Sequence, residues 1–179
     1  MSFVKEYATS VVPALKKDLG ITSSMAIPKM EKIVINVGIG SWLQGGKDFS
    51  KIVEGIEAIS AQKPVIRNAR LSVSNFKLRK GMPVGVTVTL RGEKMFDFLE
   101  RMVKVAAPRI RDFSGFSLKS FDGRGNYSLG LKTYEVFPEI HYREVVKNYG
   151  IAITFVTTAK NDEGAKALLS SFRFPFKKS

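Results

Sequence analysis

Hydroxyl, amide and guanidinium side chains lie in and around a stretch of this chain that has no acidic residue. Between Glu57 and Glu93 there are seven lysines or arginines and neither aspartate nor glutamate. Such groups donate hydrogen bonds to phosphate and ribose oxygens, and several cations together release counterions from a nucleic acid. The pattern predicts an RNA-binding surface, with a solvated sheet face as the alternative; its candidate contacts are Asn36, Lys63, Arg67, Arg70, Thr87, Thr89 and Arg91.

A second group of residues interleaves one aromatic ring with several cations. Residues 74–81 read SNFKLRKG. This composition suits phosphate contact combined with stacking on a base, whereas the alternative is that the apolar residues only anchor the loop. The polar and basic members are Ser74, Asn75, Lys77, Arg79 and Lys80.

Enzymatic sites find little support in the same sequence. Residues 38–48 superficially resemble a phosphate-binding loop, but Ser41 stands where its first glycine is required and Asp48 stands where it needs Ser or Thr. An ordinary strand-to-helix turn is therefore favoured. His141 near Glu139 is a single pair, which favours a surface or structural histidine over acid–base catalysis. Residues 121–127 lack dinucleotide-binding spacing and predict an exposed loop that offers Arg124 and Tyr127 to a partner.

Composition further narrows the classes of function that this chain could have. The 179-residue chain has 29 Lys and Arg against 16 Asp and Glu, for a net charge of +13, which favours a polyanionic partner. With no cysteine and one histidine, thiolate metal sites, disulfides and histidine-based triads lack their parts, and we expect no cofactor. We also expect a cytosolic location, because the sequence shows no secretory signal and no apolar run near the roughly 18 residues that span a bilayer.

The elements that must position these side chains follow from hydrophobic spacing. Alternation predicts strands over residues 29–37 and 84–91, with Asn36 on the face opposite the main apolar row, and further strands over residues 64–68, 134–140 and 150–158. Three- and four-residue spacing predicts helices over residues 4–19, with a kink or restart at Pro13, and over residues 49–59 with Asp48 as N-cap. Further helices are expected over residues 93–106, ended by Pro108, and from Asn161 or Asp162 through Phe172.

The order of these elements predicts the fold class. Strands and helices alternate irregularly, so we expect an α+β fold with a mixed, mainly antiparallel sheet, helices packed on one face and an exposed RNA-binding face. Residues 1–179 are expected to form a single domain with projecting loops near residues 72–83 and 109–130.

Several motifs together resemble the bacterial 5S rRNA-binding ribosomal protein family, the fifth of the large-subunit series, over essentially the whole chain. They are IPKMEKI at residues 27–33, QKP at 62–64, SNFKLRKG at 74–81, VTLRG at 88–92, PRIRDF at 108–113, SFDGRGNY at 120–127, FPEI at 137–140 and TTAK at 157–160.

The resemblance implies a non-enzymatic ribosomal protein that attaches 5S rRNA to the central protuberance. It adds Gln62 to the rRNA contacts, among which we also expect Ser72. It further implies that the basic loop of residues 74–83 approaches the elbow of P-site tRNA. It also implies an intersubunit bridge to a small-subunit head protein through Arg109, Arg111, Asp112 and Phe113, with 23S rRNA and other central-protuberance proteins as further partners.

Two rival functions come from other classes. A nucleotide-dependent enzyme would use residues 38–47, and ATP or GTP binding would favour it. A membrane-surface protein would use its positive charge on anionic lipid, but the charge excess lies in strands and a loop rather than on one amphipathic helix, so we expect no membrane partner.

Overall fold

A five-stranded antiparallel sheet organises the protein. The computed structural model describes residues 3, 7–21, 23–40, 49–140 and 149–177. The strand order is β2-β3-β1-β5-β4, and all four strand pairs are antiparallel. The bounds are β1 Met30–Gly38, β2 Val65–Asn68, β3 Pro83–Leu90, β4 Tyr127–Leu131 and β5 Ile151–Thr157. The predicted α+β class is confirmed.

The central strand β1 shows why the sheet has one apolar face. Its residues Ile33, Ile35 and Val37 are fully buried, whereas Asn36 between them is exposed. Neighbouring β3 buries Val86, Val88 and Leu90 in the same way. Because side chains alternate across a strand, all of these apolar residues face the same layer and the intervening ones face away. The predicted orientation of Asn36 is confirmed.

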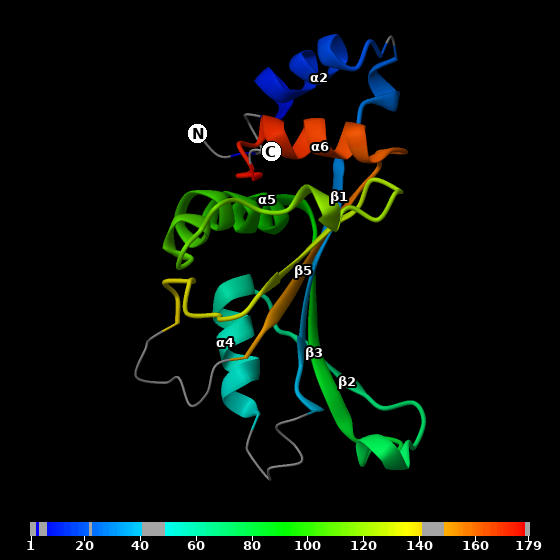
Figure 1. Ribbon diagram of the computed structural model, residues 1–179, viewed down its shortest axis with the longest axis vertical. Helices are drawn as coiled ribbons and strands as arrows, with labels where there is room; N and C mark the ends of the chain where they lie inside the picture. The colour runs from blue at the N-terminus through cyan, green and yellow to red at the C-terminus, as the bar shows by residue number, and fades with distance from the viewer. Residues whose placement is uncertain (1–2, 4–6, 22, 41–48, 141–148, 178–179) are drawn as a thin grey trace.

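Two helices cover the apolar face. The helix α4 spans Ser50–Ser60 and α5 spans Gly92–Arg101, and both lie on one side of the sheet (Figure 1). Helical spacing brings Ile52, Ile56 and Ile59 of α4 into the core. Each fully buried side chain of this size contributes about 1.5–3 kcal/mol of transfer free energy, so the covered face supplies much of the stability.

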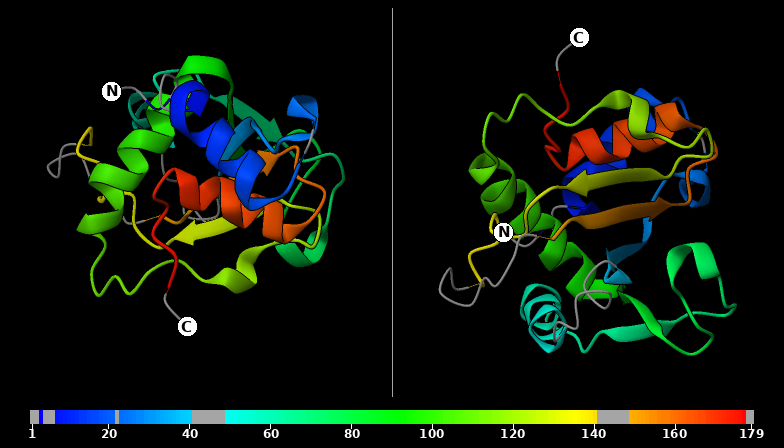
Figure 2. Two further views of the ribbon diagram at one scale, coloured as in Figure 1. Left: turned by 90° about the horizontal axis from the view of Figure 1, so that it is seen from above. Right: turned by 60° about the horizontal axis from the view of Figure 1, so that its bottom comes forward.

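Two other helices pack at one end of the sheet. The helix α2 spans Val12–Asp18 and lies against α6, Asp162–Ser171, as both figures show (Figures 1 and 2). A π-helical turn, Tyr7–Val11, precedes α2. Pro13 lies in the first turn of α2, directly after the π-helical turn, so the type of helix changes next to this residue while the chain stays helical.

The structure corrects three predicted boundaries. The chain stays helical after α5 through a π-turn, Met102–Ala106, and a 3-10 turn, Ala107–Arg109, so Pro108 does not end it. The helical run ends one residue after Pro108, since Ile110 is extended. The N-cap of α4 is Phe49, without a side-chain cap, and Asp48 lies outside the described residues. The predicted connection of residues 109–130 is shorter, because Tyr127–Leu131 forms β4.

The segment predicted as a strand over residues 134–140 forms turns instead. Tyr134, Val136 and Phe137 are nevertheless buried, so the apolar pattern there reflects packing rather than sheet pairing. Among the described helices, none is long and apolar enough to cross a membrane.

Candidate nucleic-acid interface

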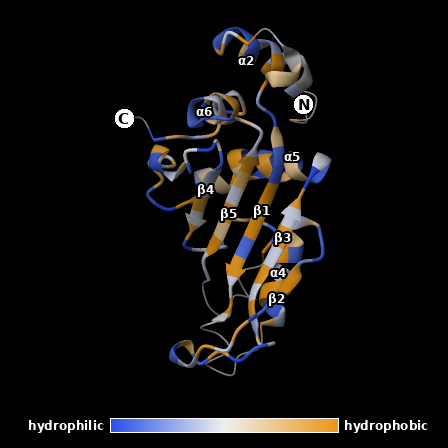
Figure 3. Ribbon diagram, turned by 90° about the vertical axis from the view of Figure 1, so that its right-hand side faces the viewer, coloured by the Kyte–Doolittle hydropathy of each residue, from blue (hydrophilic) through white to orange (hydrophobic). Residues whose placement is uncertain are grey.

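The face of the sheet opposite α4 and α5 carries no described helix, and we call it the open face (Figure 3). The register places its side chains in rows across the strands. One row runs Thr87–Asn36–Ala152, and the next runs Thr89–Val34–Thr154. Directly paired residues point to the same side of a sheet. Side chains that are far apart in sequence therefore form one surface of small polar and apolar groups.

Asn36 and Thr87 are joined on this surface. The Thr87 hydroxyl Oγ1 donates a hydrogen bond to the Asn36 carbonyl Oδ1 over 2.9 Å. Asn36 is exposed and Thr87 is half-buried. The structure thus brings two predicted contacts together as a hydrogen-bonded pair.

Cations border the open face along the β2–β3 edge. Arg67 of β2 lies opposite Gly85 and so shares the side of Thr87, while Lys63 lies just before β2 and Arg91 just after β3. All three side chains are exposed. One carboxylate is nearby, since Glu31 Oε1 lies 3.7 Å from Arg91 Nη1 and 3.9 Å from Lys32 Nζ. Exposed ion pairs of this kind hold their partners weakly, so Arg91 can exchange Glu31 for a phosphate.

Gln62 sits in the turn between α4 and β2. Its amide nitrogen Nε2 donates to the Thr89 carbonyl over 3.4 Å, and its backbone N–H donates to the buried Ser60 hydroxyl. The backbone reverses direction at Ala61, which has a φ of +51°. These bonds fix Gln62 beside the strand that carries Thr87 and Thr89, next to Lys63.

The predicted loop of residues 72–83 is an irregular hairpin at the far end of β2 and β3 (Figure 1). Backbone hydrogen bonds join Val73 and Leu78 in both directions, and the Ala69 N–H donates to the Met82 carbonyl. Ser72 accepts a hydrogen bond from the Lys80 backbone N–H over 2.9 Å. Ser72 therefore helps to hold the hairpin closed, in addition to its predicted contact role.

The hairpin exposes its side chains rather than burying them. Phe76 is 66% exposed and Leu71 is 75% exposed, so these residues do not anchor the loop in the core. The predicted contacts Ser74, Asn75, Lys77, Arg79 and Lys80 are exposed as well, as is Arg70. An exposed ring among cations is the arrangement that stacks on bases while it neutralises phosphates.

The open face also contains residues that sequence reasoning missed. Ser128 of β4 lies opposite Thr154 of β5, and their hydroxyl oxygens are 3.1 Å apart. Beside them, Gly130 lies opposite Ala152. The signal that could have found this part of the face is the alternation of Tyr127, Leu129 and Leu131, which is interrupted by serine and glycine.

The predicted bridge residues begin at Arg109, the last residue of the 3-10 turn Ala107–Arg109, and continue directly after it. Arg109, Arg111 and Asp112 are exposed, and Asp112 has a φ of +52°. Phe113 is half-buried and packs edge-on against Phe116, with ring centroids 4.9 Å apart. The segment thus combines an anchored ring with outward-facing charges.

The prediction that Tyr127 is offered to a partner is wrong. Tyr127 is fully buried among Phe121, Phe155, Phe174 and Phe176, and its hydroxyl donates to the Ser117 carbonyl over 2.8 Å. Burial raises the pKa of Tyr127. Side chains alternate between the two faces of the sheet along β4, and this alternation turns the Tyr127 ring toward the core.

Asp122 organises the turn that leads into β4. Its carboxylate accepts hydrogen bonds from the Asn126 side chain and from the backbone N–H groups of Asn126 and Arg124. These bonds, led by that of the Asn126 side chain, hold the pKa of Asp122 below its usual value. Arg124 remains exposed, as predicted.

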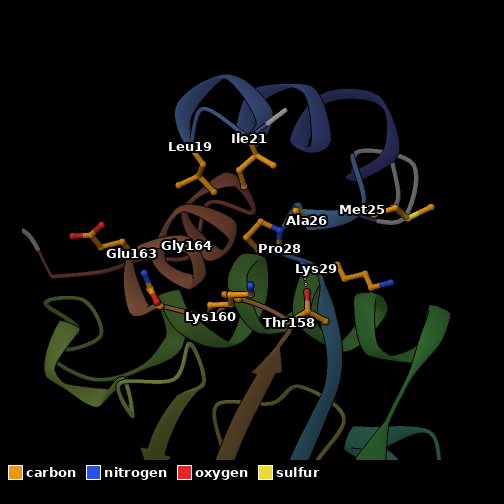
Figure 4. Close-up of a pocket in the computed structure, with 12 residues that line it drawn as sticks. Leu19, Ile21, Met25, Ala26, Pro28, Lys29, Thr158, Lys160, Glu163 and Gly164 are labelled. Carbon is orange, nitrogen blue, oxygen red and sulfur yellow. Dashed lines mark hydrogen bonds between the residues drawn. The ribbon is translucent and has the colours of Figure 1, made fainter. Parts of the chain in front are cut away.

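A cavity of about 560 Å³ lies away from the open face, between α2 and the start of α6 (Figure 4). Leu19 and Ile21 point into it from the α2 side, with Pro28 and Gly164 across from them. Its charged lining residues are Lys29, Lys160 and Glu163, and the Thr158 hydroxyl in its wall accepts a hydrogen bond from the Lys29 backbone N–H over 3.0 Å. The described residues also form no group of three or more His, Cys, Asp or Glu suited to a metal. His141 and residues 41–48 lie outside the described residues.

Comparison with known proteins covers almost the whole chain. The family model described as Ribosomal protein L5 matches residues 23–79, and the model for the C-terminus of the same ribosomal family matches residues 83–176. A Large ribosomal subunit protein uL5 from Dictyoglomus thermophilum is 52% identical over 174 residues, which are 97% of this chain and 97% of that protein. The protein of the same name from Symbiobacterium thermophilum is 54% identical over 171 residues, 96% of this chain and 95% of that protein.

Proposed function

Because the chain belongs to the ribosomal protein L5 family, a family of large-subunit proteins, we propose that its open face binds 5S rRNA and attaches it to the central protuberance. Membership makes the protein a structural constituent of the large ribosomal subunit and not an enzyme.

The observation that carries the proposal is the combination of an uncovered sheet face with a row of cations at its edge. Asn36, Thr87 and Thr89 supply amide and hydroxyl groups at the centre of the face. Lys63, Arg67 and Arg91 supply positive charge along one side. Polar groups of the first kind bond ribose and base edges, while cations of the second kind bind phosphates.

A salt-titrated binding assay tests the proposal. The purified protein is titrated with 5S rRNA, and tRNA and an unrelated structured RNA of similar length serve as competitors. We expect 5S rRNA to bind in preference to both competitors, with an affinity that falls linearly with salt on a logarithmic plot. Equal binding of all three RNAs would reduce the open face to a generic basic surface.

We further propose that the hairpin of residues 72–83 contacts P-site tRNA. Two features support this contact. The hairpin extends beyond the helices at one end of the sheet (Figure 1), and it exposes Phe76 among Lys77, Arg79 and Lys80. A surface of this kind suits the backbone and unpaired bases of a folded RNA.

Replacing Lys77, Arg79 and Lys80 together with alanine is expected to weaken tRNA binding while 5S rRNA binding changes little. The three side chains are exposed on the hairpin and away from the centre of the open face, so their loss removes phosphate contacts from one site only. The affinity for each RNA is measured separately by filter binding. An equal loss of affinity for tRNA and for 5S rRNA would contradict the proposal that the two RNAs bind at separate sites.

The segment that carries Arg109, Arg111, Asp112 and Phe113 is proposed as the bridge to a small-subunit head protein. Its support is the pairing of exposed charges with a ring held by Phe116. Charged residues on a rim favour a contact that forms and breaks readily. We propose 23S rRNA and other central-protuberance proteins as the remaining partners, since exposed cations such as Arg124 and Lys160 lie outside these surfaces.

A further inference from the structure

We propose that Thr87 is a positioning residue that fixes the side-chain amide of Asn36 as a hydrogen-bond donor toward an acceptor oxygen of the bound RNA. The inference deepens the proposed function and rests on it. It separates the roles of two residues that sequence reasoning treats as equivalent contacts.

The hydrogen bond between these residues sets the direction of the amide. Thr87 Oγ1 is the donor and Asn36 Oδ1 is the acceptor, over 2.9 Å. A hydroxyl has one hydrogen to donate, and here it is committed to the carbonyl side of the amide. The opposite side of the planar amide is the NH₂ group, which has two hydrogens to donate. Asn36 therefore presents donors, and Thr87 contributes mainly through Asn36.

Thr87 is the neighbour that hydrogen-bonds the Asn36 side chain and so orients its amide. Across β1, Asn36 lies opposite Ala152, whose side chain is a methyl group. On the Thr87 side the diagonal neighbours are Gly85 and Thr89, and the hydrogen bond of the Asn36 side chain is with Thr87. At Gly85 an added Cβ would lie 3.8 Å from Asn36 Oδ1 and 3.2 Å from the Val37 carbonyl. Among the described residues the structure gives the Asn36 amide nitrogen no hydrogen-bond acceptor. The NH₂ group is thus available to a ligand on the exposed side.

The chemistry of the ligand follows from this orientation. A neutral NH₂ donor at the centre of the face selects an acceptor, and RNA offers phosphate oxygens, ribose 2′ oxygens and base acceptors. RNA that covers the face shields the Asn36 carbonyl from water. If the Thr87 hydroxyl is removed, this carbonyl then has neither water nor its protein donor as a hydrogen-bond partner. An unsatisfied buried acceptor of this kind is costly, so the hydroxyl of Thr87 should matter although it need not touch RNA.

The first test compares two substitutions of Thr87 in the full-length protein. Thr87→Val keeps the shape but removes the hydroxyl and is expected to weaken 5S rRNA binding about tenfold, whereas Thr87→Ser keeps the donor and should stay within about threefold of wild type. Thermal unfolding of both variants checks that the fold is retained. A valine variant that binds like wild type, or a serine variant that binds as weakly as valine, overturns the inference.

The second test establishes whether Asn36 donates or accepts. Asn36→Ala removes the amide, and Asn36→Asp replaces the donor with a second acceptor that bears negative charge. If Asn36 donates, the aspartate variant binds more weakly than the alanine variant and remains weaker when salt is raised from about 0.1 M to about 0.5 M, where long-range repulsion is screened. An Asn36→Asp variant that binds 5S rRNA as tightly as the Asn36→Ala variant, or more tightly, overturns the inference.

A measurement without RNA separates this inference from the proposed function. In the free protein, nuclear magnetic resonance relaxation of the Asn36 side-chain amide should show an ordered group in wild type and in Thr87→Ser, and a mobile group in Thr87→Val. An equally mobile amide in all three proteins overturns the inference. Wild-type protein that fails to select 5S rRNA, with an amide ordered as expected, overturns the RNA-binding role of the face and leaves the orienting role of Thr87 standing.

Discussion

Replacing Lys63, Arg67 and Arg91 together with alanine is expected to weaken 5S rRNA binding on the order of 10³-fold, because each hydrogen bond to a charged group is worth roughly 1.5 kcal/mol. The three side chains are exposed along one edge of the open face. The slope of log affinity against log salt should also become shallower by about one unit for each lost phosphate contact. Salt-titrated filter binding measures both quantities.

The control removes the same charge from another surface. Lys16 and Lys17 of α2 and Lys166 of α6 are exposed at the end of the sheet, away from the open face (Figure 1). Alanine at these three positions lowers the net charge equally but should leave most of the 5S rRNA affinity intact. If both triple variants lose the same affinity, net charge rather than the open face governs binding.

Gly125→Ala is expected to destabilise the protein by about 2–5 kcal/mol, as the sum of left-handed backbone strain and overpacking. Gly125 has a φ of +79°, and an added Cβ would lie 2.6 Å from the Ala159 carbonyl oxygen and 2.9 Å from the Ala159 Cβ. The same glycine accepts a hydrogen bond from the Thr157 hydroxyl and donates one to Asp162. Denaturant unfolding, followed by circular dichroism, measures the loss.

Gly123→Ala is the matched control for this substitution. Gly123 has a φ of +80°, but no atom lies within 4 Å of an added Cβ. The backbone strain is therefore the same and the clash is absent, so the expected cost is only about 1–2 kcal/mol. Equal destabilisation by the two substitutions would mean that the close approach to Ala159 contributes nothing to stability.

The local spacing of apolar residues was sufficient to predict much of the fold. The alternation around Asn36 correctly predicted which face of β1 this residue occupies, because a strand repeats every two residues whatever lies beside it. The spacing of Ile52, Ile56 and Ile59 predicted the buried side of α4 for the same kind of reason. The family resemblance, drawn from short motifs, was also confirmed by matches over nearly the whole chain.

Local pattern failed where distant parts of the chain decide the outcome. Tyr127 is flanked by glycine, asparagine and serine, which suggests a loop, yet β5 pairs with its strand and an aromatic cluster buries its ring. Residues 134–140 have an apolar pattern but gain no strand partner. In both places the result depends on neighbours that the local sequence does not contain.

By itself, then, the sequence determined the α+β class, the acid-free basic stretch, the exposed side of β1 and the hairpin of residues 72–83, all of which depend on residue type and short-range spacing. Only the tertiary structure decided that Asn36 pairs with Thr87, that β4 and β5 complete the open face, and that Tyr127 belongs to the core. The physical reason is register: antiparallel pairing brings together residues that are 51 positions apart, and a shift of one residue would turn every side chain to the other face.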